Sequence, residues 1–307
     1  MLLIAPTGAG KTLAGFLPSL VALAGRPKRS RKPGIHTLYI SPLKALAVDI
    51  ARNLEAPLEG MALDITVETR TGDTPAHKRQ RQKHAPPDIL LTTPEQLALL
   101  LSAPDAGRFF ESLETVVLDE LHSLVTAKRG DLLALGLARL RKLRPRLRAV
   151  GLSATVAEPD DLRRWLMPQG NGEPANLADL VTVKGGAAPE VTILPAETRI
   201  PWAGHSAVHA MEAIYDQIRA SRMVLVFVNT RSQAERIFQE LWRVNEDGLP
   251  IALHHGSLDV GQRRRVEAAM AASELRCVVC TSTLDLGIDW GDVDLVINVG
   301  APKGASR

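Results

Sequence analysis

The sequence is short of cysteine, aromatic residues and long apolar runs. Two of the 307 residues are cysteines, which excludes a disulfide-stapled secreted scaffold and favours a reducing cytoplasm as the location. Aromatic residues make up 4% of the chain, so any stacking of nucleic-acid bases would depend on a few rings. No apolar run approaches the roughly 18 residues that a membrane span needs, and we therefore expect no membrane partner.

The two cysteines form a Cys-x-x-Cys pair, Cys277 and Cys280, a spacing that also occurs in redox and zinc sites. The pair and the two valines between them read as a buried β-strand, on which side chains three residues apart point to opposite faces. No second pair of Cys or His residues lies nearby in the sequence. We therefore expect both cysteines to pack in a hydrophobic core, where free cysteine behaves as a small apolar residue.

The charge of the chain is nearly balanced. Its net charge is +3, with 45% hydrophobic and 23% charged residues, which is typical of a globular protein. The sequence pI of about 9.0 permits a nucleic-acid partner without requiring one.

Short aliphatic runs alternate with helical patterns along most of the chain. This alternation predicts an α/β fold in which parallel strands are flanked by helices. In the first part, the expected strands are Leu2–Ala5, Thr37–Ile40, Ile65–Thr69, Ile89–Leu91, Val116–Leu118 and Leu147–Leu152. In the second part, they are Met223–Val228, Ile251–Leu253, Arg276–Cys280 and Val293–Val299, with helices at Ala207–Ala220, Ser232–Trp242 and Val260–Ala271.

A segment rich in Gly, Pro and Ala, residues 167–201, interrupts this alternation and reads as an interdomain connection. We therefore expect two α/β domains, residues 1–186 and 187–307. The first strand begins at residue 2, and the chain ends just after a strand, which would leave the second sheet without its last helix. The sequence therefore reads as a fragment whose second domain is incomplete.

The segment Ala5, Pro6, Thr7, Gly8, Ala9, Gly10, Lys11 and Thr12 has the pattern of a P-loop. It follows an apolar strand and opens a helix, so its backbone N–H groups and the helix N-terminus can surround phosphates. Lys11 would reach the β- and γ-phosphates of ATP, and the Thr12 hydroxyl would bind Mg²⁺. The first position of the pattern is Ala5 in place of the usual glycine, a small residue that the loop can accommodate.

Two carboxylates, Asp119 and Glu120, follow the apolar strand at residues 116–118. The carboxyl ends of parallel strands share one edge of the sheet, so these acids are expected beside the P-loop. Asp119 would hold Mg²⁺ through water, and Glu120 would orient and deprotonate the attacking water. The tripeptide Ser153-Ala154-Thr155 follows the next strand, where hydroxyls could connect the nucleotide site to a neighbouring surface.

These segments, in this order, resemble the motifs of a superfamily 2 DExH-box helicase. The same holds for ISPLKALAVD (Ile40–Asp49), TRTGDT (Thr69–Thr74), TTPEQL (Thr92–Leu97), VFVNTRSQAE (Val226–Glu235), HHGSLD (His254–Asp259) and CTSTLDLGIDWGDVD (Cys280–Asp294). The residues in these segments are similar to those of the large-helicase-related (Lhr) family, and within it to the ligase-associated branch. The likeness covers nearly the whole chain.

The resemblance implies two RecA-like domains, ATP and Mg²⁺ as cofactors, and 3′-to-5′ translocation on single-stranded DNA in DNA repair. It also implies a monomer that acts on single-stranded DNA or a DNA/RNA hybrid, with a ligase or nuclease as a possible functional associate. Gly287 and Asp289 would approach the nucleotide. The residues expected to face nucleic acid are Pro42, Leu43, Lys44, Gly72, Asp73, Thr93, Pro94, Thr230, Arg231, Gly256, Ser257, Thr281 and Ser282.

Two departures from the family pattern leave an alternative open. We find neither the adenine-recognition segment that precedes the P-loop nor the arginine-rich motif VI that follows the last strand in this family. An arginine of that kind typically contributes about 10³–10⁵ in rate. The alternative is therefore a fragment that binds nucleotide and nucleic acid but hydrolyses ATP feebly or not at all. DNA and RNA are not distinguished by the sequence, because phosphate contacts dominate in both cases.

Overall fold

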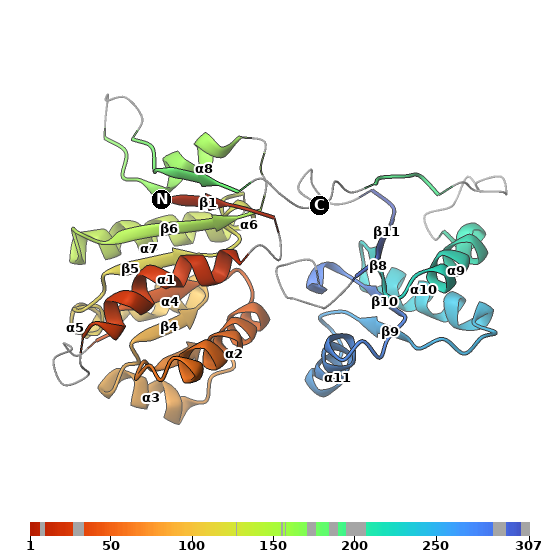
Figure 1. Ribbon diagram of the computed structural model, residues 1–307, viewed down its shortest axis with the longest axis horizontal. Coiled ribbons are helices and arrows are strands. Elements are labelled where there is room, and N and C mark those ends of the chain that lie inside the picture. Colours follow the sequence, from red (N-terminus) through yellow and green to blue (C-terminus); the bar gives the residue numbers. More distant parts are fainter. Residues whose placement is uncertain are drawn as a thin grey trace. The chain divides into compact units, whose positions relative to one another are not determined.

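A seven-stranded sheet organises the first part of the protein and a four-stranded sheet the second (Figure 1). The chain divides into two units, Met1–Ala187 and Ala188–Arg307, and each is described by itself. The structure is a computed structural model. It describes residues 1–6, 10–26, 34–126, 128–154, 156, 158–170, 176–183, 190–194, 207–284 and 293–301.

The strands of the first unit lie in the order β3-β4-β2-β5-β6-β1-β7, and all six neighbouring pairs are parallel. Because every strand runs the same way, all carboxyl ends lie at one edge of the sheet. The strands are β1 (Leu2–Ile4), β2 (Thr37–Ile40), β3 (Val67–Arg70), β4 (Ile89–Thr92), β5 (Thr115–Leu118), β6 (Arg148–Ser153) and β7 (Leu180–Thr182). The parallel arrangement confirms the predicted fold class.

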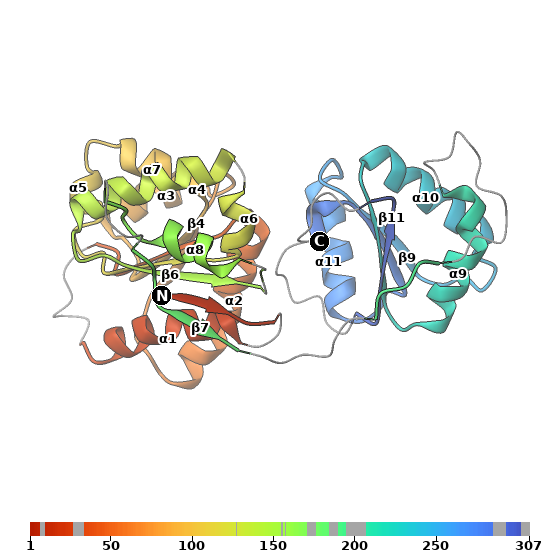
Figure 2. The ribbon, with the colours of Figure 1, turned by 90° about the horizontal axis from the view of Figure 1, so that it is seen from above.

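Eight helices of the first unit connect these strands within the described residues. They are α1 (Lys11–Ala24), α2 (Lys44–Gly60), α3 (Ala76–His84), α4 (Pro94–Ser102), α5 (Ala106–Phe109), α6 (Leu121–Val125), α7 (Lys128–Leu143) and α8 (Pro159–Leu166). Figure 2 shows the unit turned by 90°, so that helices are visible on both faces of the sheet.

The faces of this sheet are buried against different helices because side chains alternate along a strand. Leu38 and Ile40 of β2 belong to the core cluster that includes residues of α4 to α8. Tyr39, between them, points to the other face and stacks on Phe16 of α1 with ring centroids 5.0 Å apart. Both faces are therefore apolar, as the aliphatic strand patterns predict.

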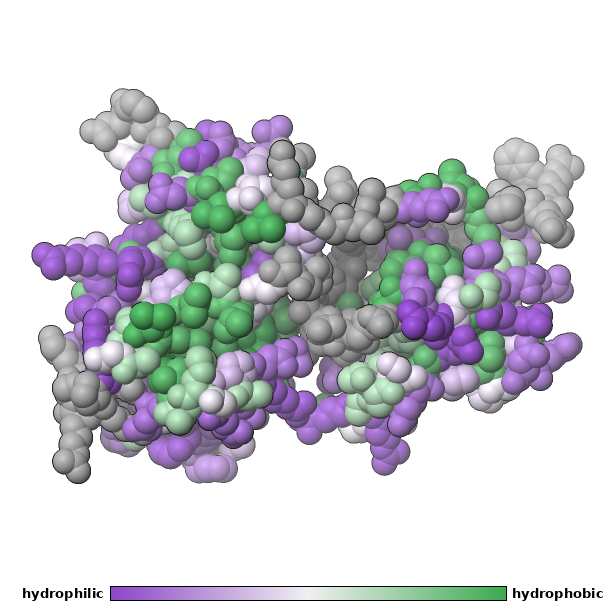
Figure 3. All heavy atoms as spheres, in the orientation of Figure 1, coloured by the Kyte–Doolittle hydropathy of each residue, from purple (hydrophilic) through white to green (hydrophobic). Residues whose placement is uncertain are grey.

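Helix α1 leaves an apolar stripe exposed on its outer side. Leu13, Leu17 and Val21 follow one another at four-residue spacing, and their exposed fractions are 47%, 53% and 65%. Hydrophobic side chains accordingly gather over α1 in the space-filling view (Figure 3). The inner side of the same helix carries Phe16 and Leu20, which are buried. The first unit by itself therefore does not cover this stripe.

Strand β7 corrects the interpretation of residues 167–201 as a connection only. Leu180, Val181 and Thr182 pair in parallel with Leu2, Leu3 and Ile4 and extend the first sheet at its edge. The side chains of β7 are exposed, so the segment lacks the apolar alternation that marks other strands. Smaller shifts also occur: β3 begins at Val67 instead of Ile65, and β6 runs to Ser153 instead of Leu152.

The second unit contains a parallel sheet in the order β11-β8-β10-β9. Its elements are η2 (Val208–Ala210), α9 (Met211–Ala220), β8 (Val224–Val228), α10 (Arg231–Val244), β9 (Ile251–His254), α11 (Val260–Ala271), β10 (Cys277–Cys280), η3 (Ser282–Leu284) and β11 (Leu295–Val299). The expected helix at Ala207–Ala220 thus begins with a 3₁₀ turn. Side chains cap two helices: Thr230 accepts from the Gln233 N–H, and Asp259 accepts from the Gly261 N–H.

The two cysteines lie in strand β10 and pack on opposite faces of this sheet. Cys277 belongs to the core beneath α9 and α10, and Cys280 belongs to the core that includes Met270 of α11. Both are free and buried, and burial raises the pKa of the Cys277 thiol to about 12. The expectation of core packing is therefore confirmed. Among the described helices, none is both long and apolar enough to cross a bilayer.

Candidate functional site

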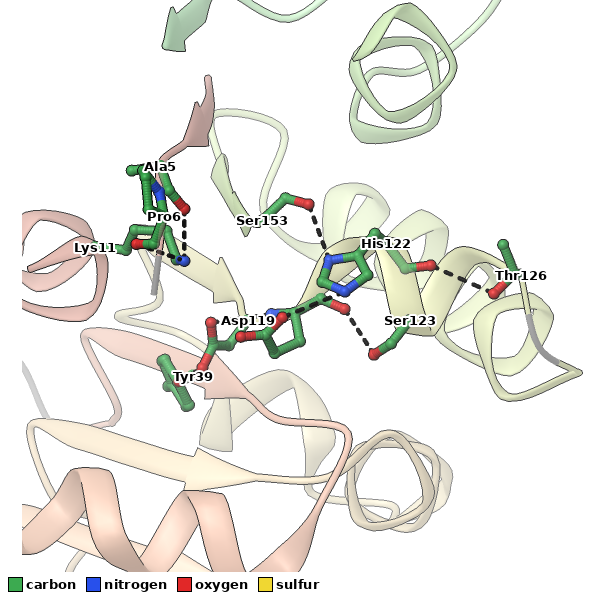
Figure 4. Close-up of polar contacts among 10 residues, drawn as sticks. Ala5, Pro6, Lys11, Tyr39, Asp119, His122, Ser123, Thr126 and Ser153 are labelled. Atoms are coloured by element: carbon green, nitrogen blue, oxygen red, sulfur yellow. Dashed lines mark hydrogen bonds and ion pairs between the residues drawn. The ribbon is translucent and has the colours of Figure 1, made fainter. Parts of the chain in front are cut away.

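The P-loop region connects strand β1 to helix α1. Gly10 precedes the helix with φ = 74°, a left-handed conformation that glycine adopts without strain. The Lys11 ammonium donates hydrogen bonds to the carbonyl oxygens of Ala5 (2.7 Å) and Pro6 (3.2 Å), as Figure 4 shows. Thr12 is partly buried in the first turn of α1. The predicted phosphate-binding residues Thr7, Gly8 and Ala9 lie outside the described residues.

Asp119 and Glu120 follow strand β5, two strands away from β1 in the sheet. Their exposed fractions are 4% and 8%. Oδ2 of Asp119 accepts a hydrogen bond from the Tyr39 hydroxyl, and Oδ1 accepts from the Glu120 N–H at 2.9 Å. Burial and the neighbouring Glu120 charge raise the pKa of Asp119 to about 6, although the Tyr39 hydroxyl and Lys11 act in the opposite direction.

Glu120 has a backbone conformation that is unusual for a residue with a side chain. Its φ and ψ are both 46°, in the left-handed region, which typically costs about 1–3 kcal/mol. Burial raises the pKa of Glu120, and the positive charge of Lys11 lowers it in part. Burial also lowers the pKa of Lys11, against the attraction of Glu120 and Asp119. One cation and two carboxylates thus share a poorly solvated place at the edge of the sheet.

His122 joins this group, although the sequence analysis assigned it no role. Its Nδ1 lies 3.0 Å from the Ser153 hydroxyl at the end of β6, and its Nε2 lies 3.4 Å from Glu120 Oε2 (Figure 4). Burial and the Lys11 charge lower the pKa of His122. The only signal in the sequence was its position in the D-E-x-H pattern. The structure thus places Ser153 in contact with the acidic motif; Thr155 lies outside the described residues.

Oxygen ligands suited to Mg²⁺ are available at this place. The Asp119 carboxylate and the Thr12 hydroxyl are hard oxygen donors of the kind that Mg²⁺ prefers. Within the described residues no cluster of three or more His, Cys, Asp or Glu side chains could hold a metal alone. This donor set fits an ion that is bound through one carboxylate together with substrate phosphates.

The predicted nucleic-acid residues of the first unit lie at the other end of the same sheet edge. Pro42, Leu43 and Lys44 follow β2; Gly72 and Asp73 follow β3; Thr93 and Pro94 follow β4. These three strands are neighbours in the order β3-β4-β2, whereas the phosphate loop and the acids follow β1 and β5. The strand order therefore separates the predicted nucleic-acid residues from the predicted nucleotide residues along one edge. The two groups adjoin where β2 lies next to β5.

Several contacts hold the loops of the first group in shape. In the turn after β3, the Thr71 N–H donates to the Thr74 hydroxyl (2.9 Å), and the Asp73 N–H donates to the Thr71 hydroxyl (3.3 Å). The Lys44 ammonium lies 2.9 Å from Asp73 Oδ1, although both side chains are more than half exposed. Two predicted contact residues from different loops therefore pair with each other across a solvated surface.

The second unit carries the remaining predicted residues at the carboxyl edge of its own sheet. Thr230 and Arg231 follow β8, Gly256 and Ser257 follow β9, and Thr281 and Ser282 follow β10. Arg231 Nη1 lies 3.3 Å from the Ser257 hydroxyl, which links two of these loops. Gly287 and Asp289, expected near the nucleotide, lie outside the described residues.

A buried histidine stabilises the loop after β10. His254 Nδ1 lies 2.9 Å from the Thr283 hydroxyl, and its Nε2 lies 3.1 Å from Glu267 Oε1 of α11. The Thr281 N–H also donates to the His254 carbonyl at 3.2 Å. In the sequence, His254 is notable only as the first residue of the HHGSLD segment, so this positioning role follows from the structure alone.

Comparison with known proteins agrees with this geometry. Residues 1–162 match the family described as DEAD/DEAH box helicase, and residues 207–307 match the helicase conserved C-terminal domain. The chain belongs to the DEAD/DEAH box helicases. The predicted resemblance to this superfamily is therefore confirmed.

Relatives of this DEAD/DEAH box chain include proteins named Lhr. An Lhr helicase and probable uracil glycosylase of Mycolicibacterium smegmatis is 38% identical over 98% of this chain and 22% of its own length. The ATP-dependent helicase Lhr-Core protein 2 of Thermococcus barophilus is 36% identical over 100% of this chain and 37% of its own length. The chain thus spans well under half the length of these relatives.

A solved structure shares the fold. The Mycobacterium smegmatis helicase Lhr, bound to single-stranded DNA and AMP-PNP, superposes with a TM-score of 0.79. It is 39% identical in sequence, and the match covers 98% of this chain and 40% of that one. This similarity supports the assignment of RecA-like helicase units.

Proposed function

We propose that this chain is the motor core of an ATP-dependent helicase that couples ATP hydrolysis to movement along single-stranded DNA. The observation that carries the proposal is the arrangement along one sheet edge. The P-loop lysine and two buried carboxylates follow β1 and β5, and the loops assigned to nucleic acid follow the adjoining strands β2, β4 and β3. A motor needs both sites on one rigid element, so that an event at one site is felt at the other.

Each residue of the nucleotide site has a specific role in this proposal. Lys11 binds the β- and γ-phosphates, and Thr12 and Asp119 hold Mg²⁺, which neutralises phosphate charge when it is bound. Glu120 orients and deprotonates the attacking water, a task that its raised pKa favours. His122 holds the Glu120 side chain in place and connects it to Ser153.

The nucleic-acid site is proposed to hold the sugar–phosphate backbone without reading bases. Most of the candidate residues are hydroxyls, small residues and cations near helix N-termini, which suit phosphate contacts; the acidic member, Asp73, pairs with Lys44. DNA is favoured over RNA because the Mycobacterium smegmatis Lhr structure contains single-stranded DNA. Movement in the 3′-to-5′ direction, a role in DNA repair, a cytoplasmic location and a monomeric state are proposed with it, as the family resemblance implies. A ligase or nuclease associate belongs to the same proposal.

A hydrolysis assay with a matched inactive variant tests the proposal. ATPase activity of the chain is measured with and without single-stranded DNA, beside Glu120→Gln, which keeps the side-chain volume and removes the base. We expect hydrolysis that rises with DNA and is lost in Glu120→Gln, while both proteins bind a fluorescent ATP analogue in the presence of Mg²⁺. Nucleotide binding without hydrolysis above the variant would favour the non-catalytic alternative, and absence of nucleotide binding would overturn both.

A second measurement concerns the nucleic acid. Binding to DNA and RNA oligonucleotides of one sequence is compared at several salt concentrations. We expect tighter binding to the DNA, with an affinity that falls as salt rises because phosphate contacts release counterions. Preference for RNA would remove DNA translocation from the proposal.

A further inference from the structure

One arginine in the first unit contacts two of the loops assigned to nucleic acid. Arg129 is the second residue of α7. Its Nε and Nη2 donate to the two carboxylate oxygens of Glu95, the latter at 3.0 Å, and its Nη1 donates to the Pro42 carbonyl at 2.6 Å. The guanidinium thus uses its planar fork on a carboxylate and its remaining side on a backbone oxygen.

One partner, Pro42, belongs to the proposed nucleic-acid surface, and the other, Glu95, directly follows two of its residues. Pro42 lies in the loop after β2, between Ser41 and the start of α2. Glu95 lies in the first turn of α4, directly after Thr93 and Pro94, and its carboxylate also accepts a hydrogen bond from the Thr93 side chain. A single side chain therefore fixes the loop after β2 relative to the loop after β4. Burial alone raises the pKa of Glu95, but the Arg129 and Thr93 hydrogen bonds outweigh it and lower the pKa overall.

The same arginine is connected to Glu120, the proposed catalytic base, through helices α6 and α7. The Glu120 carbonyl accepts hydrogen bonds from the N–H and the hydroxyl of Ser123 in α6. Gly130, next to Arg129, lies against the end of α6: a Cβ atom there would be 2.2 Å from the Leu124 carbonyl oxygen. Helix α7 therefore packs on α6 at backbone distance. The contacts run without a break from Glu120, through α6 and α7, to Arg129 and the two loops.

We propose that Arg129 is a positioning residue that holds the loops after β2 and β4 in their nucleic-acid-binding geometry and connects them to Glu120. This inference rests on the proposed function, because it assigns a task to a residue of that site. Arg129 itself need not contact the strand. Arg129 keeps Thr93 and Pro42 at a fixed separation. Without this contact, the two loops would lose more conformational entropy when they bind nucleic acid.

The chain offers a matched control for an ordinary ion pair. Arg26 also contacts both carboxylate oxygens of one glutamate, through Nη1 and Nη2 to Glu114 at 2.7 and 3.4 Å, and its side-chain exposure of 48% is similar to the 40% of Arg129. Glu114 precedes β5, so this pair lies at the amino edge of the sheet, away from the proposed site. A general effect of breaking an Arg–Glu pair would appear in Arg26→Ala as well.

The test compares Arg129→Ala, Arg129→Lys, Glu95→Gln and Arg26→Ala with the wild-type chain. A fluorescent oligo-dT strand reports DNA affinity at one salt concentration, a fluorescent ATP analogue with Mg²⁺ reports nucleotide affinity without DNA, and thermal unfolding reports folding. We expect Arg129→Ala to bind DNA about tenfold more weakly, since the two loops would then have to be ordered when they bind. Arg129→Lys and Glu95→Gln should be intermediate, with nucleotide affinity unchanged in all four variants and DNA affinity unchanged in Arg26→Ala.

Three outcomes would overturn the inference in distinguishable ways. If folded Arg129→Ala and Glu95→Gln bind DNA as tightly as the wild type, the contacts of Arg129 with Glu95 and Pro42 do not position the loops. Equal losses in Arg129→Ala and Arg26→Ala would show a general stability effect. A wild-type chain that binds nucleotide but no single-stranded DNA would remove the proposed function itself, and with it the task assigned to Arg129.

Discussion

The Tyr39 hydroxyl donates a hydrogen bond to Asp119 Oδ2, and this contact joins β2 to β5 where the two groups of site residues meet. Tyr39 is fully buried and stacks on Phe16 of α1, the helix that begins with Lys11. One side chain therefore touches the acidic motif with its hydroxyl and the P-loop helix with its ring. Burial and the Asp119 charge raise the pKa of Tyr39 well above its usual value, so that it remains a donor.

The variant Tyr39→Phe removes this hydrogen bond and keeps the aromatic ring. Because the bond is made to a carboxylate, its loss should lower the free energy of unfolding by about 1.5–3 kcal/mol when Asp119 is ionised. The loss should be smaller at pH 5 than at pH 8, since the hydroxyl favours the charged form of Asp119. Urea unfolding of both proteins at the two pH values measures this. Equal losses at pH 5 and pH 8 would contradict the assignment.

The variant Asp119→Asn should change how stability depends on pH. The pKa of Asp119 is raised from 3.8 to about 6 in the folded chain, so the folded state holds this proton more tightly than the unfolded state. The stabilisation that protonated Asp119 gives the folded state is present in full below about pH 4. It is lost as the pH rises through 6, by about 3 kcal/mol of unfolding free energy in total. Asp119→Asn has no ionisable group at this position, so its free energy of unfolding should not fall for this reason as the pH rises. Unfolding free energies of both proteins at pH 4 and 7.5 test the difference, and parallel pH profiles would refute it.

The variant Gly130→Ala should destabilise the first unit. Its Cβ would lie 2.2 Å from the Leu124 carbonyl oxygen, so α6 and α7 would have to move apart, at a cost of about 1–3 kcal/mol or more. Gly60, the last residue of α2, is a suitable control because, among the described residues, no neighbouring atom lies within 4 Å of the place that its methyl group would take. Gly60→Ala should be neutral or stabilise by up to about 1 kcal/mol. Thermal unfolding of both variants and the wild type tests this prediction. Similar melting temperatures for the two variants would disprove the close contact.

The variant His254→Ala should weaken the second unit and its proposed nucleic-acid loop. It removes a buried ring and leaves Thr283 and Glu267 without this partner, which typically costs about 1–3 kcal/mol. His84→Ala, an exposed position at the end of α3, serves as the control and should be within about 0.5 kcal/mol of wild type. Urea unfolding and oligo-dT binding are measured together. A His254→Ala protein as stable as His84→Ala would show that the bridge is dispensable.

The two cysteines give a simple test of the second core. Cys277 and Cys280 are buried on opposite faces of β10, and the pKa of Cys277 is raised to about 12. Because the thiolate is the reactive form, both thiols should resist an aromatic disulfide reagent in the folded protein and react in denaturant. Exposed Cys residues introduced at the surface would react at once. Rapid labelling of native protein would contradict the packing.

Local sequence patterns determined the main features of this protein. The P-loop, the acidic pair after an aliphatic strand and the order of the motifs lie in short segments whose chemistry is visible without a structure. The aliphatic strands were found for the same reason, since a strand buried on both faces, such as β5, has an unbroken apolar run. Strand β7 was missed because all three of its side chains are exposed, and only its pairing with β1 makes it a strand.

The tertiary structure alone decided which of these segments touch. Tyr39 and Asp119 are 80 residues apart in sequence, and Arg129 and Pro42 are 87 residues apart. No local periodicity encodes such contacts, because they follow from the strand order β3-β4-β2-β5-β6-β1-β7. That order depends on how helices pack on both faces of the sheet. The sequence therefore determined which chemistry the chain carries. The strand order of the sheet placed the P-loop lysine, the acidic pair and the Arg129 contacts along one edge.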